Sequence, residues 1–269
     1  MSETSLPVIV DGLGVRRPLG RTPLPPGFKL AVRGAARVIP ESQWQEFDVR
    51  QVPGYPLKVK DQNGFGACVG HAAASSLELA RWYGGLDHVD LSPWYVYAIL
   101  CQGWDRGASI GEALGVVREK GAPAFSAVPY GTINPRKLSD ASHADAGRHR
   151  VEIGAVIETW DEFVSAVALR QSINFSVHAG SNFDRLDDEG VAGFSSGPGN
   201  HAVSAGFGLK RLRNGEWAPL CLNSWTVLYG DGGYFHITRK HWEQQSYREA
   251  YVVQAVADDP TDPIPTPGV

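Results

Sequence analysis

The stretch Val59-Lys-Asp-Gln-Asn-Gly-Phe-Gly-Ala-Cys-Val-Gly-His-Ala-Ala-Ala74 places a cysteine where a glycine-rich loop turns into a helix. We predict that the helix begins at about Cys68, because residues 67–83 contain no proline and carry apolar faces. Small residues crowd its first turns, which indicates close packing by neighbouring elements. A thiol at a helix N-terminus lies near unpaired N–H groups and the positive end of the helix dipole. Cys68 is therefore a candidate nucleophile, although most free cysteines are small buried hydrophobes.

Two later segments carry the polar residues that a thiol nucleophile needs. They are Gly199-Asn-His-Ala-Val-Ser-Ala-Gly-Phe-Gly208 and Leu222-Asn-Ser-Trp-Thr-Val-Leu-Tyr-Gly-Asp-Gly-Gly-Tyr-Phe235. Their histidine and asparagine follow the cysteine by roughly 130 to 150 residues, a separation typical of one group of thiol enzymes. Together with the cysteine segment, they resemble the active-site motifs of the papain-like cysteine peptidases. The resemblance covers roughly residues 45 to 256.

The resemblance implies a role for each matched residue in the hydrolysis of peptide bonds. Cys68 would be the nucleophile and His201 the proton carrier, and the two would rest as a thiolate–imidazolium pair. Asn223 would orient the imidazole of His201, and Trp225 would shield that contact from water. The side chain of Gln62, with the N–H of the cysteine, would form the oxyanion hole. Such a site needs no metal and no organic cofactor, and its substrates would be peptides or proteins.

Other residues are candidates for the walls of the substrate cleft. In the family, the loop before the helix predicted at 109–120 pairs its backbone with bound peptide, which points to Gly107 and Ala108. Asn200 and His178 could also line the cleft. His71 shares a helical face with the nucleophile, but a hydrogen-bonded core histidine is the expected state.

The chain departs from the family pattern at two positions beside the site. Val69 replaces a tryptophan, and Thr226 replaces a glycine. Neither position supplies a reacting group, but both shape the walls of the site. Narrow specificity or weak activity would follow.

Helices are predicted in the first half of the chain and strands in the second, which indicates an α+β fold. The resemblance implies two lobes, in which a helical lobe with the central nucleophile helix packs against an antiparallel, β-barrel-like lobe. Further helices are predicted at 92–100, 109–120 and 159–169, strands at 173–179, 201–211, 217–225, 233–238 and 249–256, and a surface excursion at 129–150.

The dipeptide Asn214-Gly215 predicts a hairpin between the histidine and asparagine strands. A two-residue turn there would place Asn223 opposite Gly206 rather than His201. The resemblance requires the histidine and asparagine to meet. We therefore expect a longer loop or a bulge, and the sequence leaves both open.

Composition narrows the setting of the protein. The 269 residues, 43% of them hydrophobic, can bury a full core, and a net charge of −4 with both signs interspersed gives no footprint for nucleic acid or an anionic membrane. No signal peptide and no membrane-spanning run is recognisable. Phe65 stands where secreted relatives carry a disulfide cysteine. A reducing compartment is expected, cytoplasmic or virion-associated, with Cys101 and Cys221 as free thiols; a bridge between them is the alternative.

Both ends of the chain are rich in proline. We expect an extended arm at residues 1–44, the peptidase domain at 45–256 and a tail at 257–269. The arm lacks the helical pattern of family propeptides. It could lie across its own cleft as a latent inhibitor or bind protein partners together with the tail, and the matching composition of the tail favours partners. Two alternative functions follow: a structural subunit of an assembly such as a virus particle, or an amide hydrolase acting on cell-wall peptides.

Overall fold

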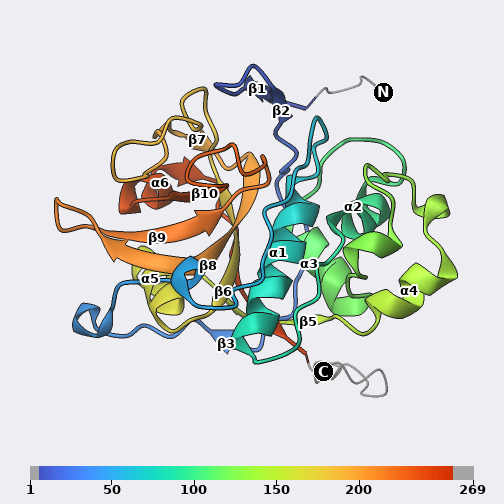
Figure 1. Cartoon of the computed structure of the whole chain (residues 1–269), viewed down its shortest axis with the longest axis horizontal. Coiled ribbons are helices and arrows are strands. Elements are labelled where there is room, and N and C mark those ends of the chain that lie inside the picture. Colours follow the sequence, from blue (N-terminus) through green and yellow to red (C-terminus); the bar gives the residue numbers. More distant parts are fainter. Residues whose placement is uncertain (1–5, 257–269) are drawn as a thin grey trace.

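Helix α1 (Cys68–Tyr83) stands at the centre of the computed structural model, which describes residues 6–256 (Figure 1). Its residues from Cys68 to Arg81 are all buried. The predicted close packing is confirmed at Gly70, where a Cβ atom would lie 2.7 Å from the carbonyl oxygen of Pro93. The tail expected at 257–269 lies outside the described residues.

The next three helices after α1 lie on one side of it (Figure 1). Ser109 and Glu112 form a capping box at the start of α3, the helix predicted at 109–120. Ser92 occupies the N-cap position of α2, but its hydroxyl makes no capping hydrogen bond, so only the proline at the first helical turn supports that start. The helices of this lobe are α2 (Pro93–Cys101), α3 (Ile110–Glu119) and α4 (Asp140–Ala146), with 3₁₀ turns η3 (Phe125–Ala127) and η4 (Pro135–Lys137).

The other side of α1 faces an eight-stranded, mainly antiparallel sheet with α5 and α6 beside it (Figure 1). The α+β class is confirmed, and the strand path stays open at both ends and does not close into a barrel. The path runs β10 (Tyr234–His236), β9 (Trp217–Leu222), β8 (His201–Arg211), β6 (Ser172–Val177), β12 (Ala250–Ala255), β5 (Val151–Val156), β3 (Gly34–Ala35), with β4 (Phe47–Asp48) on β8; the helices are α5 (Trp160–Ala168) and α6 (Arg239–Glu243).

Shorter elements complete the described chain. Strands β1 (Val8–Val10) and β2 (Arg16–Pro18) form a hairpin, which lies above the junction between α1 and the sheet lobe (Figure 1). Strands β7 (Gly197–Pro198) and β11 (Gln245–Ser246) pair in parallel. The turns η1 (Glu41–Gln43) and η2 (Val49–Gln51) precede the peptidase motifs.

Several elements were not predicted from the sequence, and helix α4 and strand β5 are the longest of them. Helix α4 lies within the segment predicted as a surface excursion, and Ser139 caps it through the N–H of Ser142. Strand β5 follows directly and alternates buried and half-buried residues over most of its length. The segment before β5 is polar, and the alternation in β5 itself is short. Neither α4 nor β5 was therefore predicted.

The hairpin between β8 and β9 contains both a longer loop and a bulge, as the sequence required. The last strand pair is Arg211 with Trp217, and the register shifts between Ala205 and Gly208. Gly206 makes the bulge possible. Its φ is +108°, and a Cβ atom there would lie 2.4 Å from the backbone oxygen of Gln171, the residue before β6. This shift brings the beginning of β8 beside the end of β9.

All three cysteines are free and buried, so the alternative bridge between Cys101 and Cys221 is not formed. Among residues 6–256, no helix combines the length and apolar character needed to cross a membrane.

Candidate active site

The sequence motifs meet at the junction of the two lobes. Cys68 is the first residue of α1, His201 the first of β8, and Asn223 follows β9 directly. The Nε2 of His201 lies 2.8 Å from the Oδ1 of Asn223. The backbone of Ala202, the residue after His201, lies close enough to the thiol of Cys68 to lower its pKa. The helix start and the two strands therefore bring these three residues, called the triad below, into one buried cluster.

The imidazole of His201 is fixed on one edge and unpartnered on the other. The ring of Trp225 is fully buried and lies 4.8 Å from the imidazole, centroid to centroid. The Nδ1 of His201 is buried and has no hydrogen-bond partner within the described part of the chain. One ring nitrogen thus holds the orientation while the other remains available for proton transfer.

The side chain of Gln62 is oriented by Ser224, a residue to which the sequence assigned no role. The hydroxyl of Ser224 donates to the Oε1 of Gln62 at 2.7 Å, so the amide NH₂ must point the other way. This Nε2 donates to the carbonyl oxygens of Phe65, at 2.7 Å, and of Pro18, at 3.0 Å. The donor predicted for an oxyanion hole therefore binds a carbonyl of the N-terminal arm.

The arm continues through the site beyond Pro18. The backbone of Gly20 lies close enough to the thiol of Cys68 to lower its pKa, against the larger effect of burial. The N–H of Ala108 donates to the oxygen of Gly20 at 2.8 Å, and the N–H of Thr22 donates to the oxygen of Ala108 at 2.9 Å. This pairing is parallel. Because the arm fills the space over the nucleophile, the exposed fraction of Cys68 is 0%.

Glycines allow the arm to approach this closely. A Cβ atom on Gly20 would lie 1.7 Å from the oxygen of Gly66, and one on Gly107 would lie 2.1 Å from the oxygen of Gly20. Gly107 also has φ +71°, so a side chain there would be strained in any case. The carboxylate of Asp105 accepts from the N–H of Gly66 at 3.0 Å and from the hydroxyl of Tyr97. The hydrogen bond between Gly66 and Asp105 therefore links the loops that lie on the two sides of the arm.

Two buried arginines of the arm, to which no sequence pattern pointed, add ion pairs. Arg17 lies 2.8 Å from Asp11 and 3.0 Å from Asp61. Arg21 lies 2.6 Å from Glu249. Isolated charges in a proline-rich segment carry no periodic signal, so only their partners in the folded chain identify them.

Burial sets the protonation of the covered site. Desolvation raises the pKa of Cys68 to about 11, although the N–H groups around the thiol act in the opposite direction. Desolvation also lowers the pKa of His201 to about 4. With the arm in place, the site therefore holds a neutral thiol and a neutral imidazole. The expected thiolate–imidazolium pair was wrong for this state, because the arm excludes the water that would stabilise both charges.

The remaining candidates divide between the cleft wall and the scaffold. Asn200 accepts the N–H of Arg21 with its backbone oxygen at 3.2 Å, while its side chain bonds to the backbone of Ala179. His178 is half-buried and its Nδ1 lies 2.8 Å from the oxygen of Pro198. His71 bonds through Nδ1 to the oxygen of Ala67 at 3.0 Å and packs against an indole ring, as expected of a core histidine.

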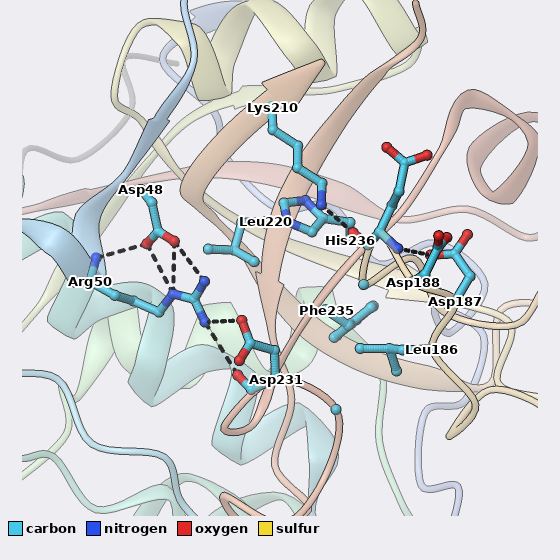
Figure 2. A pocket seen from close by; sticks show the side chains of 13 residues that line it. Asp48, Arg50, Leu186, Asp187, Asp188, Lys210, Leu220, Asp231, Phe235 and His236 are labelled. Carbon is cyan, nitrogen blue, oxygen red and sulfur yellow. Dashed lines mark hydrogen bonds and ion pairs between the residues drawn. The ribbon is translucent and has the colours of Figure 1, made fainter. Parts of the chain in front are cut away.

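An open cavity of about 550 Å³ lies elsewhere, on the sheet lobe (Figure 2). None of the triad residues lines it. The guanidinium of Arg50, which lines the cavity, lies 2.6 Å from Asp48 and 2.8 Å from Asp231. Lys210 donates to the backbone oxygen of Glu189. The cations of Arg50 and Lys210 are therefore paired within the wall of the cavity.

Known proteins resemble the chain along most of its length. The sequence model described as papain family cysteine protease matches residues 44–255. No curated protein sequence matches at a significant level. Among solved structures, xylellain, a cysteine protease from Xylella fastidiosa, has a TM-score of 0.68 at 18% identity, covering 93% of this chain and 98% of that one.

Two further structures share the fold at lower scores. The bromelain protease from Ananas comosus in complex with the E64 inhibitor gives a TM-score of 0.59 at 24% identity, covering 79% of this chain and 99% of that one. Digestive procathepsin L 3 from the larval midgut of Tenebrio molitor gives 0.59 at 17%, covering 87% and 74%. At these identities the likeness establishes the fold.

Proposed function

Because the chain belongs to the papain family of cysteine proteases, we propose that it is a latent peptidase whose own N-terminal arm closes the catalytic cleft. The observation that carries this proposal is the path of the arm, which binds Gln62 through Pro18 and, at Gly20, passes beside the fully buried thiol of Cys68. Both groups are those that a substrate must reach.

The chemistry proposed for the open site uses residues of this chain alone. Cys68 attacks the scissile carbonyl, and the amide of Gln62 with the N–H of the cysteine stabilises the oxyanion. His201 protonates the leaving amine through its unpartnered Nδ1, and water then cleaves the thioester with the same ring as base. Asn223 keeps the ring in the orientation that its 2.8 Å contact defines.

The geometry of the arm supports an inhibitor rather than a substrate. A scissile carbonyl must have its carbon at the sulfur and its oxygen at Gln62 at the same time. Here the carbonyl on Gln62 belongs to Pro18, whereas the backbone group at the thiol belongs to Gly20, two residues later. No single peptide group meets both requirements, so the arm occupies the site without offering a bond for cleavage.

The same contacts favour a latent peptidase over a structural subunit of an assembly, because the arm binds its own catalytic domain. An amide hydrolase of cell-wall peptides would use the same four residues on another substrate. Turnover of ordinary peptides distinguishes that activity from the one proposed.

We expect Gly20→Leu to release latency. A leucine side chain cannot fit against the oxygen of Gly66, which lies 1.7 Å from the Cβ position. Overpacking of this kind costs about 1–3 kcal/mol, so the open fraction and the hydrolysis of a small fluorogenic peptide should rise on the order of 10- to 100-fold.

The matched control for this substitution is Gly34→Ala, also in the arm, where a Cβ atom meets nothing within 4 Å. Its activity should equal that of the unsubstituted chain. Equal activity of the Gly20→Leu and Gly34→Ala chains, both folded by circular dichroism, would contradict arm-mediated latency.

The pH dependence of thiol labelling should differ between the closed and the open chain. In the closed chain the pKa of Cys68 is about 11, so the reactive thiolate is absent near pH 6. Displacing the arm restores water and lets the helix N-terminus and the imidazolium lower that pKa. Iodoacetamide or an E64-type epoxide at pH 5–6 should then label Cys68 rapidly in the Gly20→Leu chain and slowly in the unsubstituted one.

Peptide mapping locates the adduct in this experiment. Modification only above pH 8, or mainly on Cys101 or Cys221, would remove the basis for the proposed nucleophile. Both of these thiols are buried, and burial raises their pKa values as well.

A further inference from the structure

The phenol ring of Tyr229 is buried among the aromatic side chains that contact the imidazole of His201. Tyr229 is 5% exposed, and its ring lies 5.2 Å from that of Trp225 and 6.0 Å from that of Phe183, between centroids. The same two rings lie 4.8 and 6.2 Å from the imidazole. The hydroxyl of Tyr229 donates to the backbone oxygen of Phe183 at 2.9 Å. Tyr229 is therefore one ring away from the imidazole, and its hydroxyl hydrogen is already used.

The side chain of Asn223 is satisfied on one side only. Its Oδ1 accepts from the Nε2 of His201 and from the N–H of Ser224, both at 2.8 Å. Its Nδ2 is buried and has no hydrogen-bond partner among residues 6–256. A buried donor without an acceptor is costly, so the group that Nδ2 faces influences how the amide is oriented.

Nδ2 faces the phenol oxygen of Tyr229. Burial raises the pKa of Tyr229 well above its usual value, and the side chain of Asn223 acts in the opposite direction. A donor has this effect when it lies close to the oxygen that would carry the charge. Backbone bonds keep the two residues together, because Asn223 donates to the oxygen of Gly233 at 3.0 Å and Gly233 donates to the oxygen of Tyr229 at 2.7 Å. Since the hydroxyl hydrogen points to Phe183, the lone pairs of the phenol oxygen remain for Nδ2.

We propose that Tyr229 is a positioning residue of the peptidase, whose phenol oxygen accepts from the Nδ2 of Asn223 in the open enzyme and so fixes the amide with its oxygen toward His201. The inference rests on the proposed peptidase function. In the closed chain the contact stops short of a hydrogen bond. Catalytic hydrogen bonds commonly tighten only when the reacting groups are in place.

The direction of these bonds decides which proton His201 can carry. An amide turned by 180° would present its NH₂ instead of its oxygen to Nε2. It would oppose the imidazolium, or favour the neutral ring with its hydrogen on Nδ1, which cannot accept the proton of the thiol. Tyr229 opposes that turn, because Oδ1 would then meet a phenol oxygen whose hydrogen points to Phe183. The N–H of Ser224 opposes it as well, so loss of the phenol oxygen should weaken the orientation without abolishing it.

The test is Tyr229→Phe in the Gly20→Leu chain, since phenylalanine keeps the ring and removes only the oxygen. We expect kcat/KM for a fluorogenic peptide to fall about 10-fold, as for loss of one hydrogen bond, with most of the loss in kcat. The matched control is Tyr95→Phe, which removes a buried hydroxyl of α2 that lies 2.8 Å from the Nδ1 of His143. It should lose comparable thermal stability and keep its turnover.

The pH profile separates positioning from packing. The bond to Asn223 raises the pKa of His201, against the larger effect of burial. A looser amide lowers that pKa, and the imidazolium that protonates the leaving amine is lost as the pH rises through it. The alkaline limb of kcat/KM should therefore move to lower pH by about one unit in Tyr229→Phe and stay in place in the control. Besides its partner thiol, the ionisable groups that act on this ring are Arg17 of the arm and His71 of α1, and neither substitution alters them.

A double substitution with Asn223→Ala provides a second readout. Once the amide is gone, Tyr229→Phe should change kcat/KM by less than about twofold. An equal loss with and without Asn223, or an alkaline limb that does not move, would mean that Tyr229 only packs against its neighbours, and would overturn the inference. Absence of epoxide labelling at Cys68 in the Gly20→Leu chain removes the proposed function instead.

NMR of the Gly20→Leu chain decides the question if Tyr229→Phe does not fold. Only one of the two Nδ2 hydrogens of Asn223 faces the phenol oxygen, so their resonances should be separated further than in free asparagine. A separation like that of free asparagine would contradict the bond to Tyr229.

Discussion

Replacing Cys68 by alanine is expected to remove at least about 10⁴-fold of the turnover of the Gly20→Leu chain, as in other enzymes that lose their nucleophile. In the proposed mechanism the sulfur forms the covalent intermediate, and no other described cysteine lies at the start of α1. Alanine keeps the helix start and leaves only the small space of one sulfur atom. Activity against a fluorogenic peptide and a thermal unfolding curve measure the two effects separately.

Cys221→Ala is the matched control, since this thiol is also free, is 0% exposed and lies in strand β9. It should keep its turnover. Retained turnover in a folded Cys68→Ala chain would contradict the assigned nucleophile.

Gln62→Ala should lower kcat by about 10²- to 10³-fold in the same background, as loss of one oxyanion donor does. The reason is the fixed direction of the amide, because Ser224 holds Oε1 at 2.7 Å and leaves Nε2 pointing toward the site. KM should change little, since the bond to the oxyanion strengthens in the transition state. Initial-rate kinetics over a range of substrate concentrations separate kcat from KM.

The Gly20→Leu background matters for this comparison, because Gln62 also binds the arm through Pro18. In the unsubstituted chain, loss of that bond would partly open the cleft and mask the catalytic defect. Gln254→Ala, at an exposed position on β12, serves as the control. An undiminished kcat after Gln62→Ala would mean that the oxyanion lies elsewhere.

Local signals predicted the catalytic scaffold well. The start of α1 at Cys68 follows from the small residues after a glycine-rich loop, and the capping boxes at Ser109 and Thr159 fix α3 and α5. The register argument also held, because residue spacing alone required a longer loop or a bulge between β8 and β9. These features depend on neighbours in sequence, which one chain displays directly.

The path of the arm could not be read in the same way. It depends on the absence of side chains at Gly20, Gly66 and Gly107, which are far apart in sequence and meet only in the folded chain. The pair of Arg21 and Glu249 spans most of the chain as well. The prediction of a thiolate at Cys68 failed for the same reason. The helix terminus is a local signal, whereas burial under the arm depends on residues far away in sequence.

Strand β3 anchors the arm to the sheet on the C-terminal side of the segment that covers the cleft. Gly34 and Ala35 pair with β5, and the N–H of Arg33 donates to the oxygen of Ile153 at 2.8 Å. The segment in the cleft ends at Thr22, so residues 23–33 tether it to the sheet. Tethering of this kind gives an effective concentration of about millimolar.

Dilution therefore cannot separate inhibitor and enzyme while the chain is intact. The closed and open states exchange reversibly at a ratio that does not depend on how much protein is present. A single cut between residues 23 and 33 would convert the segment into a diffusible peptide. After such a cut the peptide would be held only by these contacts and would dissociate on dilution, and activation would become effectively irreversible.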